Sequence, residues 1–249
     1  MKVSIVTSVF NGEKYLEETI LSVISQTYAN IEYIIIDGGS TDGTIDIIKK
    51  YENKISYWIS EKDESMYDGI NKGIKKATGD IVASLNSDDF YADENVVRDV
   101  VNYINQAKCD GVYGNVVKFY SNINRKVEKK IFQVNYKQLL LSKHSTFMPQ
   151  PTLFLKKEIY KDLNYFDLHY RYASDFDFNL RCIKHFNIKY FDRKITYFRQ
   201  HEESITSSGK LEKERLEILE QNNINDYNWF ILNFNYYYLW VVYKFRNYN

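Results

Sequence analysis

The sequence predicts an α/β fold with a mainly parallel, doubly wound sheet. Over roughly the first 120 residues, short runs rich in β-branched residues alternate with longer segments of helical periodicity. The second of these runs, "IEYIIID", is apolar enough to be covered on both faces, which is typical of a strand in a parallel sheet. Polar clusters follow the strands at their carboxyl ends, where such sheets bind ligands.

The first strand is expected over residues 2–10, where "KVSIVTSVF" is rich in β-branched residues. Residues 12–26 carry apolar side chains at helical spacing and predict a helix. A second strand is expected over 31–37 and a second helix over 44–52.

The alternation continues with a short strand over 55–60 and a helix over 66–77. A fourth strand is expected over 79–86, then a helix over 93–105 and a strand over 110–120. This order predicts that helices cover both faces of the sheet.

Three polar clusters follow predicted strands: "TSVFNG", "DGGSTDG" and "NSDD". The fold should bring them to one edge of the sheet. Neither GxGxxG nor GxxxxGK[ST] follows the first strand, which argues against a dinucleotide site and a P-loop. Carboxylates can accept hydrogen bonds from ribose and base, and can hold a cation that binds phosphate. The edge therefore suits a nucleoside diphosphate with Mn²⁺ or Mg²⁺.

Composition limits the other functions. The chain has 249 residues, and Lys plus Arg equals Asp plus Glu at 33 each, so no net positive field favours nucleic acid. Its two cysteines are far apart, which fits a reducing, cytoplasmic compartment. The N-terminus reads as a strand rather than a signal peptide, and no stretch is long enough for a membrane-spanning helix.

The ordered motifs resemble those of family 2 glycosyltransferases. The opening "VSIVTSVFNGEKYLEETILSVISQTYANIEYIIIDGGSTDGT" is followed by "NKGIKKATGD" and "NSDD", and the resemblance continues in "YASDFDFNLR". It implies a GT-A fold, a nucleotide-sugar donor, a divalent metal ion and inversion at the anomeric carbon. "SEKDESMYDGINKGI" and "SDFD" further resemble enzymes that build bacterial surface polysaccharides.

The resemblance implies a nucleotide-binding role for several residues. Thr7, Val9 and Asn11 match the loop that touches base and ribose. Asp37 matches the aspartate that hydrogen-bonds the nucleotide, usually at a uracil edge, which implies UDP. The alternative is that Asp37 only caps its turn or the next helix.

Asp63, Asp68 and Lys72 also lie in a family motif, which implies a ligand-facing role. Asp68 and Lys72 are four residues apart on a predicted helix, so an exposed ion pair is the alternative.

The "NSDD" cluster is the predicted metal site. The family motif is usually DxD, so Asn86 departs from it and brings an amide oxygen for a ribose hydroxyl. Asp88 matches the second aspartate, Ser87 is grouped with the nucleotide contacts, and Asp89 follows. Which aspartate binds the metal is open, and a helix N-cap is the alternative for the pair.

The later motif supplies the predicted base. Asp175 matches the family's catalytic base, and a helix N-terminus favours its ionised form. Ser174 is expected to cap the same helix and Asp177 to be structural. The alternative for Asp175 is a purely helix-stabilising role. His201 is either a metal or phosphate ligand or a plain surface residue, and His144 is placed near the acceptor cleft.

We expect one GT-A domain over 1–208, with a nucleotide-sugar half over about 1–120 and an acceptor half over about 121–208. Residues 209–249 form a helical, aromatic extension. Its Trp, Tyr and basic residues suit either a membrane interface or a helix packed on the domain.

The resemblance therefore implies a metal-dependent inverting glycosyltransferase for cell-surface glycans. It would use a UDP-sugar and a saccharide or lipid-diphosphate-linked acceptor, in the cytoplasm or at the inner face of the membrane. The alternatives are a nucleotidyltransferase and a non-catalytic subunit that binds nucleotide-sugar.

Overall fold

A computed structural model of the chain describes residues 1–129, 131–140, 148–201 and 210–222. The first half contains β1 Val3–Val9, α1 Leu16–Ile24, β2 Ile31–Asp37, α2 Thr44–Lys50, β3 Tyr57–Ser60, α3 Met66–Lys76, β4 Ile81–Ser84, β5 Phe90–Tyr91, α4 Val96–Ala107 and β6 Gly111–Tyr120. The second half contains β7 Arg125–Lys129, α5 Tyr136–Leu140, β8 Phe154–Lys156, α6 Lys157–Asp162, α7 Ser174–His185, β9 Ile188–Gln200 and α8 Lys210–Gln221.

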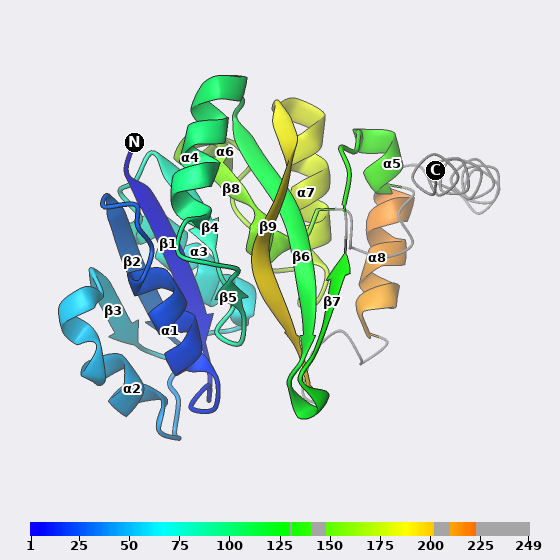
Figure 1. Cartoon of the computed structure of the whole chain (residues 1–249). Helices are drawn as coiled ribbons and strands as arrows, with labels where there is room; N and C mark the ends of the chain where they lie inside the picture. Colours follow the sequence, from blue (N-terminus) through cyan, green and yellow to red (C-terminus); the bar gives the residue numbers. More distant parts are fainter. Residues whose placement is uncertain (130, 141–147, 202–209, 223–249) are drawn as a thin grey trace.

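The nine strands within the described residues belong to one sheet, in the order β3-β2-β1-β4-β8-β6-β9-β5 with β7 paired to β6 (Figure 1). The predicted alternation of strands and helices through residue 120 is confirmed, and the two-residue strand β5 is an addition to it. Strands β3, β2, β1 and β4 are parallel. Val9 pairs with Asp37, and Asp37 pairs with Ser60. The carboxyl ends of β1, β2 and β3 therefore lie side by side.

The other half of the sheet is mixed. β8 runs antiparallel between β4 and β6, and β6 runs parallel to β9. β4 and β6 are thus separated by a strand that comes later in the chain. This arrangement brings the end of β9 back towards the region after β4, since β5 pairs antiparallel with β9.

Helices cover both faces of the sheet because side chains alternate along each strand. Tyr33 and Ile35 of β2 pack in one buried cluster with α1, α2 and α4. Ile34 and Ile36 pack in the other cluster with α3, α6 and α7. Figure 1 shows α1 and α4 in front of the sheet and α3 and α7 behind it. This confirms the doubly wound, three-layer arrangement.

Helix α8 is the described part of the predicted extension. Ile218 and Leu219 belong to the same buried cluster as α7, so α8 packs on the domain. The aromatic stretch predicted to contact either membrane or protein, residues 229–249, lies outside the described residues. Within the described ranges, no helix has the length and apolar content needed to cross a bilayer.

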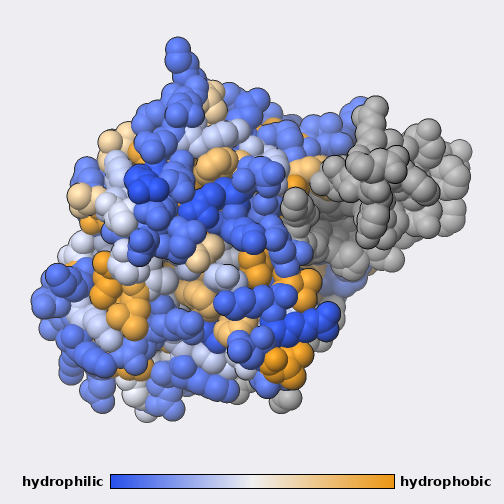
Figure 2. All heavy atoms as spheres, viewed as in Figure 1, coloured by the Kyte–Doolittle hydropathy of each residue, from blue (hydrophilic) through white to orange (hydrophobic). Residues whose placement is uncertain are grey.

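The surface is mainly polar on the face seen in Figure 2, where hydrophobic residues form small separate groups. Such isolated apolar groups are ordinary for a folded domain. One large apolar side chain, Phe10, is 64% exposed and lines a cavity at the ends of the strands.

Candidate functional site

A cavity of about 620 Å³ opens at the carboxyl ends of β1, β2 and β4. Segments far apart in the chain line it: Ser8–Gly12, Lys14, Tyr15, Gly38, Lys62–Tyr67, Asn86–Asp88, Gln150, Pro151, Arg171, Tyr172, Asp175, Phe198, His201 and Leu211. The predicted residues among them are Val9, Asn11, Asp63, Asn86, Ser87, Asp88, Asp175 and His201. The remaining predicted residues, which do not line the cavity, are Thr7, Asp37, Asp68, Lys72 and Asp89.

The adjacent aspartates after β4 have separate roles. Asp88 lines the cavity with its side chain 32% exposed, and its Oδ2 lies 2.9 Å from His201 Nε2. Asp89 is fully buried. Its Oδ1 accepts a hydrogen bond from the Arg199 backbone N–H at 2.9 Å, and its Oδ2 accepts one from Asn86 Nδ2 at 2.8 Å. Asp88 is therefore the carboxylate that faces the cavity.

Burial raises the pKa of Asp89 well above its usual value, and the negative charge of Asp88 adds to this. The backbone N–H and the charge of Arg199 act in the opposite direction. The helix-cap alternative for the pair does not hold, because α4 begins only at Val96 and its N-cap is Asn95.

Arg199 fixes the backbone at this point. Its guanidinium is 4% exposed, donates from Nε to the Asp88 carbonyl at 2.9 Å and also pairs with Glu18. It lies 4.5 Å from the ring centre of Tyr15. Strand β9 therefore carries Arg199, which holds the backbone of Asp88, and is followed directly by His201.

A divalent ion fits this wall as a partial site. Among the described residues no group of three or more His, Cys, Asp or Glu side chains is arranged to hold a metal. Asp88 and His201 offer one carboxylate and one imidazole side by side. Ions such as Mg²⁺ are often held by one or two protein groups, with substrate phosphates and water completing the shell. The donor set therefore suits a metal that arrives with a diphosphate.

Asn86 leaves one polar atom without a partner. Its Nδ2 donates to Asp89, whereas its Oδ1 is buried and has no hydrogen bond among the described residues. A buried acceptor without a donor is costly. Because Asn86 lines the cavity, a ligand hydroxyl could supply that donor.

Asp37 holds the turn after β2 and is fully buried. Its Oδ2 accepts from the N–H groups of Gly39 and Ser40 at 3.1 and 3.0 Å and from the Ser60 hydroxyl at 2.6 Å. Gly39 has φ +83°, a conformation that glycine adopts readily. The structure thus shows the turn-capping alternative for Asp37, while the neighbouring Gly38 lines the cavity.

The loop after β1 is tied to the same turn. Asn11 has φ 49°, which asparagine tolerates better than most residues. Its Oδ1 accepts from the Thr41 N–H at 2.9 Å. Thr7, in contrast, is fully buried, with its hydroxyl 3.2 Å from the Tyr33 hydroxyl. Of the predicted contacts in this strand and loop, Val9 and Asn11 reach the cavity and Thr7 does not.

Lys72 joins three carboxylates beside the cavity. Its Nζ lies 2.7 Å from Asp63, 2.9 Å from Glu61 and 3.4 Å from Asp68. The hydrogen bond to Asp63 raises the pKa of Lys72. Burial raises the pKa of Asp63 despite this partner, because its side chain is only 8% exposed. Asp68 and Lys72 are thus ion-paired as in the alternative, although their side chains are half-buried rather than exposed, and of the residues joined by Lys72 it is Asp63 that lines the cavity.

Asp175 lies in the first turn of α7 and lines the cavity. Its Oδ1 accepts hydrogen bonds from the Tyr67 hydroxyl at 3.1 Å and from the Phe176 N–H at 2.8 Å. Burial raises the pKa of Asp175 above its ordinary value, against these two hydrogen bonds and the charge of Arg215. Burial thus opposes the ionised form that the helix N-terminus is expected to favour, and a raised pKa makes the carboxylate a better proton acceptor.

The cap of α7 differs from the prediction. Ala173 is the N-cap residue, and the Ser174 hydroxyl donates instead to the Asp167 carbonyl at 2.8 Å. Glu214 of α8 accepts from consecutive N–H groups just before the helix, those of Arg171, Tyr172 and Ala173, at 3.0, 2.7 and 2.8 Å. A residue distant in sequence therefore caps this turn.

Two further predictions concern Asp177 and His144. Asp177 pairs with Arg181 at 2.6 Å and has the structural role expected of it. His144 lies outside the described residues. The cavity also contains residues that the motifs did not single out, chiefly Phe10, Tyr67 and Gln150. Phe10 lies within the cluster "TSVFNG", but its exposure cannot be read from the sequence. Gln150 is brought to the cavity by the order of the strands.

Comparison with known sequences identifies the family. The model of the family described as "Glycosyl transferase family 2" matches residues 4–164. An uncharacterized glycosyltransferase of Haemophilus influenzae is 30% identical over 220 residues, which cover 83% of this chain and 82% of that protein. A PGL/p-HBAD biosynthesis glycosyltransferase of Mycobacterium bovis is 26% identical over 183 residues, covering 72% and 68%.

Solved structures show the same fold. S. aureus TarS 1–349, in complex with UDP-GlcNAc, superposes with a TM-score of 0.72 at 22% identity and covers 88% of this chain. The mannosyltransferase PcManGT from Pyrobaculum calidifontis, in complex with GDP-Man and Mn²⁺, gives a TM-score of 0.66 at 14% identity over 90% of this chain. The chain spans 65% and 64% of these two solved chains.

The family match covers more than half of the chain, and the relative from Haemophilus influenzae aligns along most of both sequences. The structural matches agree with the observed fold. This chain is therefore a glycosyltransferase with the GT-A fold, and it belongs to the family 2 glycosyltransferases.

Proposed function

We propose that this glycosyltransferase transfers a sugar from a nucleoside diphosphate donor, a UDP-sugar, with inversion at the anomeric carbon. In this proposal a divalent ion, Mn²⁺ or Mg²⁺, is bound by Asp88 and His201, and Asp175 is the general base. One observation carries the proposal: the pair Asp88 and His201 and the half-buried carboxylate of Asp175 line the same cavity.

The wall formed by β1, β2 and β4 is suited to the nucleotide. Asn86 Oδ1 is a buried acceptor awaiting a donor, which a ribose hydroxyl would provide. Phe10 is exposed at the cavity and offers a flat apolar face to a base. The complexes of TarS with UDP-GlcNAc and UDP support the choice of a uridine nucleotide.

The diphosphate would meet the wall that carries Asp88 and His201. A divalent ion bound there supplies positive charge that stabilises the departing diphosphate. The Mn²⁺ in the PcManGT complex supports this part of the proposal. Arg199 supports the site from beneath by holding the Asp88 carbonyl, and the buried Asp89 holds Asn86.

Transfer with inversion needs a single base on the acceptor side. The acceptor hydroxyl oxygen forms a bond to the anomeric carbon while the bond from that carbon to the diphosphate oxygen breaks. The nucleoside diphosphate leaves with the bonding electron pair. The Asp175 carboxylate takes the proton of the acceptor hydroxyl, and its raised pKa suits that task.

The acceptor in this proposal is a saccharide or a lipid-diphosphate-linked saccharide in the synthesis of a cell-surface glycan. Lys62 and Arg171 add positive charge at the cavity, which is compatible with an acceptor that carries phosphate. We propose a cytoplasmic enzyme that contacts the inner face of the membrane. The relative named for PGL/p-HBAD biosynthesis supports a role in a surface glycoconjugate.

A panel of nucleotide sugars tests this function. The purified full chain is incubated with Mn²⁺ and each UDP-, GDP- or dTDP-sugar, and release of the nucleoside diphosphate is followed. Slow hydrolysis of one UDP-sugar, accelerated by an acceptor saccharide, is the expected result. Tight UDP-sugar binding by calorimetry with no turnover on any acceptor would instead indicate the non-catalytic subunit. A nucleotidyltransferase is not retained, because the family is that of glycosyltransferases.

A further inference from the structure

The two oxygens of Asp175 have different surroundings. Among the described residues, Oδ1 accepts hydrogen bonds from the Tyr67 hydroxyl at 3.1 Å and from the Phe176 N–H at 2.8 Å. Among the described residues Oδ2 receives no hydrogen bond, although Asp175 lines the cavity. A carboxylate held by one oxygen leaves its other oxygen free to accept a proton.

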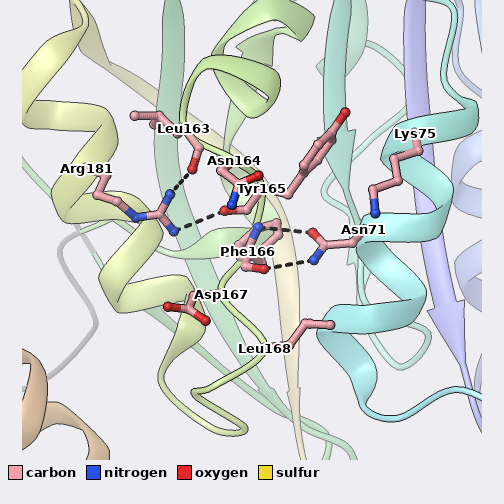
Figure 3. A pocket seen from close by; sticks show the side chains of 9 residues that line it. All are labelled: Asn71, Lys75, Leu163, Asn164, Tyr165, Phe166, Asp167, Leu168 and Arg181. Carbon is pink, nitrogen blue, oxygen red and sulfur yellow. Dashed lines mark hydrogen bonds between the residues drawn. The ribbon is translucent and has the colours of Figure 1, made fainter.

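Tyr67 is itself held firmly. It lies on α3, is 3% exposed and stacks on the ring of Phe166, with ring centres 5.4 Å apart and planes inclined by 27°. Asn71 lies one helical turn further along α3, on the same side of the helix. Asn71 accepts from the Phe166 N–H at 3.1 Å and donates to the Phe166 carbonyl at 2.8 Å (Figure 3).

The segment that Asn71 holds leads into the helix of the base. Figure 3 shows the Asn71–Phe166 pair beside Arg181, which donates to the carbonyls of Leu163 and Tyr165. The second cavity drawn there, of about 480 Å³, is lined by these structural contacts. These hydrogen bonds hold the segment between α6 and α7, which leads into the helix that carries Asp175.

The groups that face Asp175 come from two helices. From α3 the Tyr67 hydroxyl contributes a hydrogen bond, and from α8 the buried guanidinium of Arg215 contributes positive charge. Glu214, also on α8, acts on the Tyr67 hydroxyl through its negative charge. Both Tyr67 and Arg215 favour the ionised carboxylate, whereas burial disfavours it.

We propose that Tyr67 is the positioning residue of the catalytic base: its hydroxyl fixes Oδ1 of Asp175, so that Oδ2 receives the proton of the acceptor hydroxyl. This rests on the proposed role of Asp175 as the base. Tyr67 forms no bond with substrate in this step and acts through the orientation and charge of Asp175. The position of α3 therefore also affects the pKa of Asp175, because the first turn of this helix carries the cavity residues Met66 and Tyr67.

The variant Tyr67→Phe removes the hydroxyl and keeps the ring that stacks on Phe166. Because the lost hydrogen bond favours the ionised carboxylate, the pKa of Asp175 should rise further. Turnover needs the ionised base, so the acid limb of the kcat profile should move to higher pH. We expect kcat at neutral pH to fall about tenfold, the size of one hydrogen bond to a charged group. KM for the donor should not change.

Tyr160→Phe is the matched control. Tyr160 is 1% exposed and belongs to the same buried cluster, but its hydroxyl contacts the Val82 carbonyl at 3.5 Å rather than the site. This variant should keep the wild-type pH profile. The midpoint of a pH profile does not depend on the fraction of active protein, so it remains informative even if Tyr67→Phe lowers stability.

An unchanged acid limb and kcat in Tyr67→Phe would overturn the proposal while leaving the proposed function intact. If the proposed function is wrong, the experimental result is different, because the wild-type chain then transfers no sugar from any donor. A shift of the acid limb to lower pH would also contradict the proposal, because it would mean that the hydroxyl disfavours the ionised base.

Discussion

At the scale of single residues, neighbours in the sequence differ in chemistry because the fold separates their environments. Asp88 faces the cavity and His201, whereas Asp89 is fully buried against Asn86 and the backbone of Arg199. The energetic cost of two adjacent carboxylates is thereby reduced, since one accepts two hydrogen bonds inside the protein and the other can meet a cation.

The residue pair leads to a prediction about Asp88. Asp88→Asn keeps the shape but removes the charge that would attract a divalent ion. UDP affinity in Mn²⁺ should weaken by about tenfold or more, or roughly 1.4 kcal/mol, while affinity in EDTA should match that of the wild type. Titration calorimetry measures both. Asp162→Asn, an exposed change on α6, is the control and should bind UDP normally.

A second prediction concerns the base. Asp175→Asn keeps the size of the side chain but cannot accept the acceptor's proton. Turnover should fall on the order of 10²–10⁴, and UDP affinity should survive. Asp177→Asn is the comparison, because that carboxylate pairs with Arg181 and should not be needed for proton transfer. If Asp175→Asn turned over at the wild-type rate, the base would have to be another group.

Residue types alone could not divide the predicted site residues into those that line the cavity and those that support it. The sequence predicts Asp37 at the end of a strand, but only the structure shows that its Oδ2 accepts hydrogen bonds from Gly39, Ser40 and Ser60. His201 is 113 residues from Asp88, and no local pattern relates the two. Their contact follows from the pairing of β5 with β9.

At the scale of elements, α8 acts on α7 through Glu214. Its carboxylate accepts hydrogen bonds from the N–H groups of Arg171, Tyr172 and Ala173, just before α7 begins. The neighbouring Arg215 is 4% exposed and lies 4.4 Å from the Phe176 ring centre. Helix α8 therefore stabilises the turn that carries the base.

This contact gives a stability prediction. Glu214→Ala should lower the free energy of unfolding by about 1–3 kcal/mol, as the loss of hydrogen bonds to a charged group does. A Tm shift of a few degrees is expected for a domain of this size. Glu220→Ala on an exposed position of the same helix is the control and should leave Tm nearly unchanged. Equal Tm values for the wild type and Glu214→Ala would show that the cap contributes little.

At the scale of the whole molecule, periodicity predicted which segments form strands and helices through residue 120, because each is a local property of side-chain spacing. Strand neighbours are not local. The three-residue strand β8 lies between β4 and β6, although it follows both in the chain, and nothing in its own pattern indicates that place. The position of Gln150 at the cavity, just before β8, could therefore not be predicted from the sequence, whereas that of Asp175 was.

We propose that nucleotide binding depends on a divalent ion at Asp88 and His201. The most direct measurement is calorimetric titration of UDP into the full chain, first after EDTA treatment and then with Mn²⁺ or Mg²⁺ restored. We expect the metal to tighten UDP binding by about tenfold or more. Turnover should be lost in EDTA and recovered with the metal. Equal UDP affinity in both conditions, with full turnover by the metal-free protein, would contradict it.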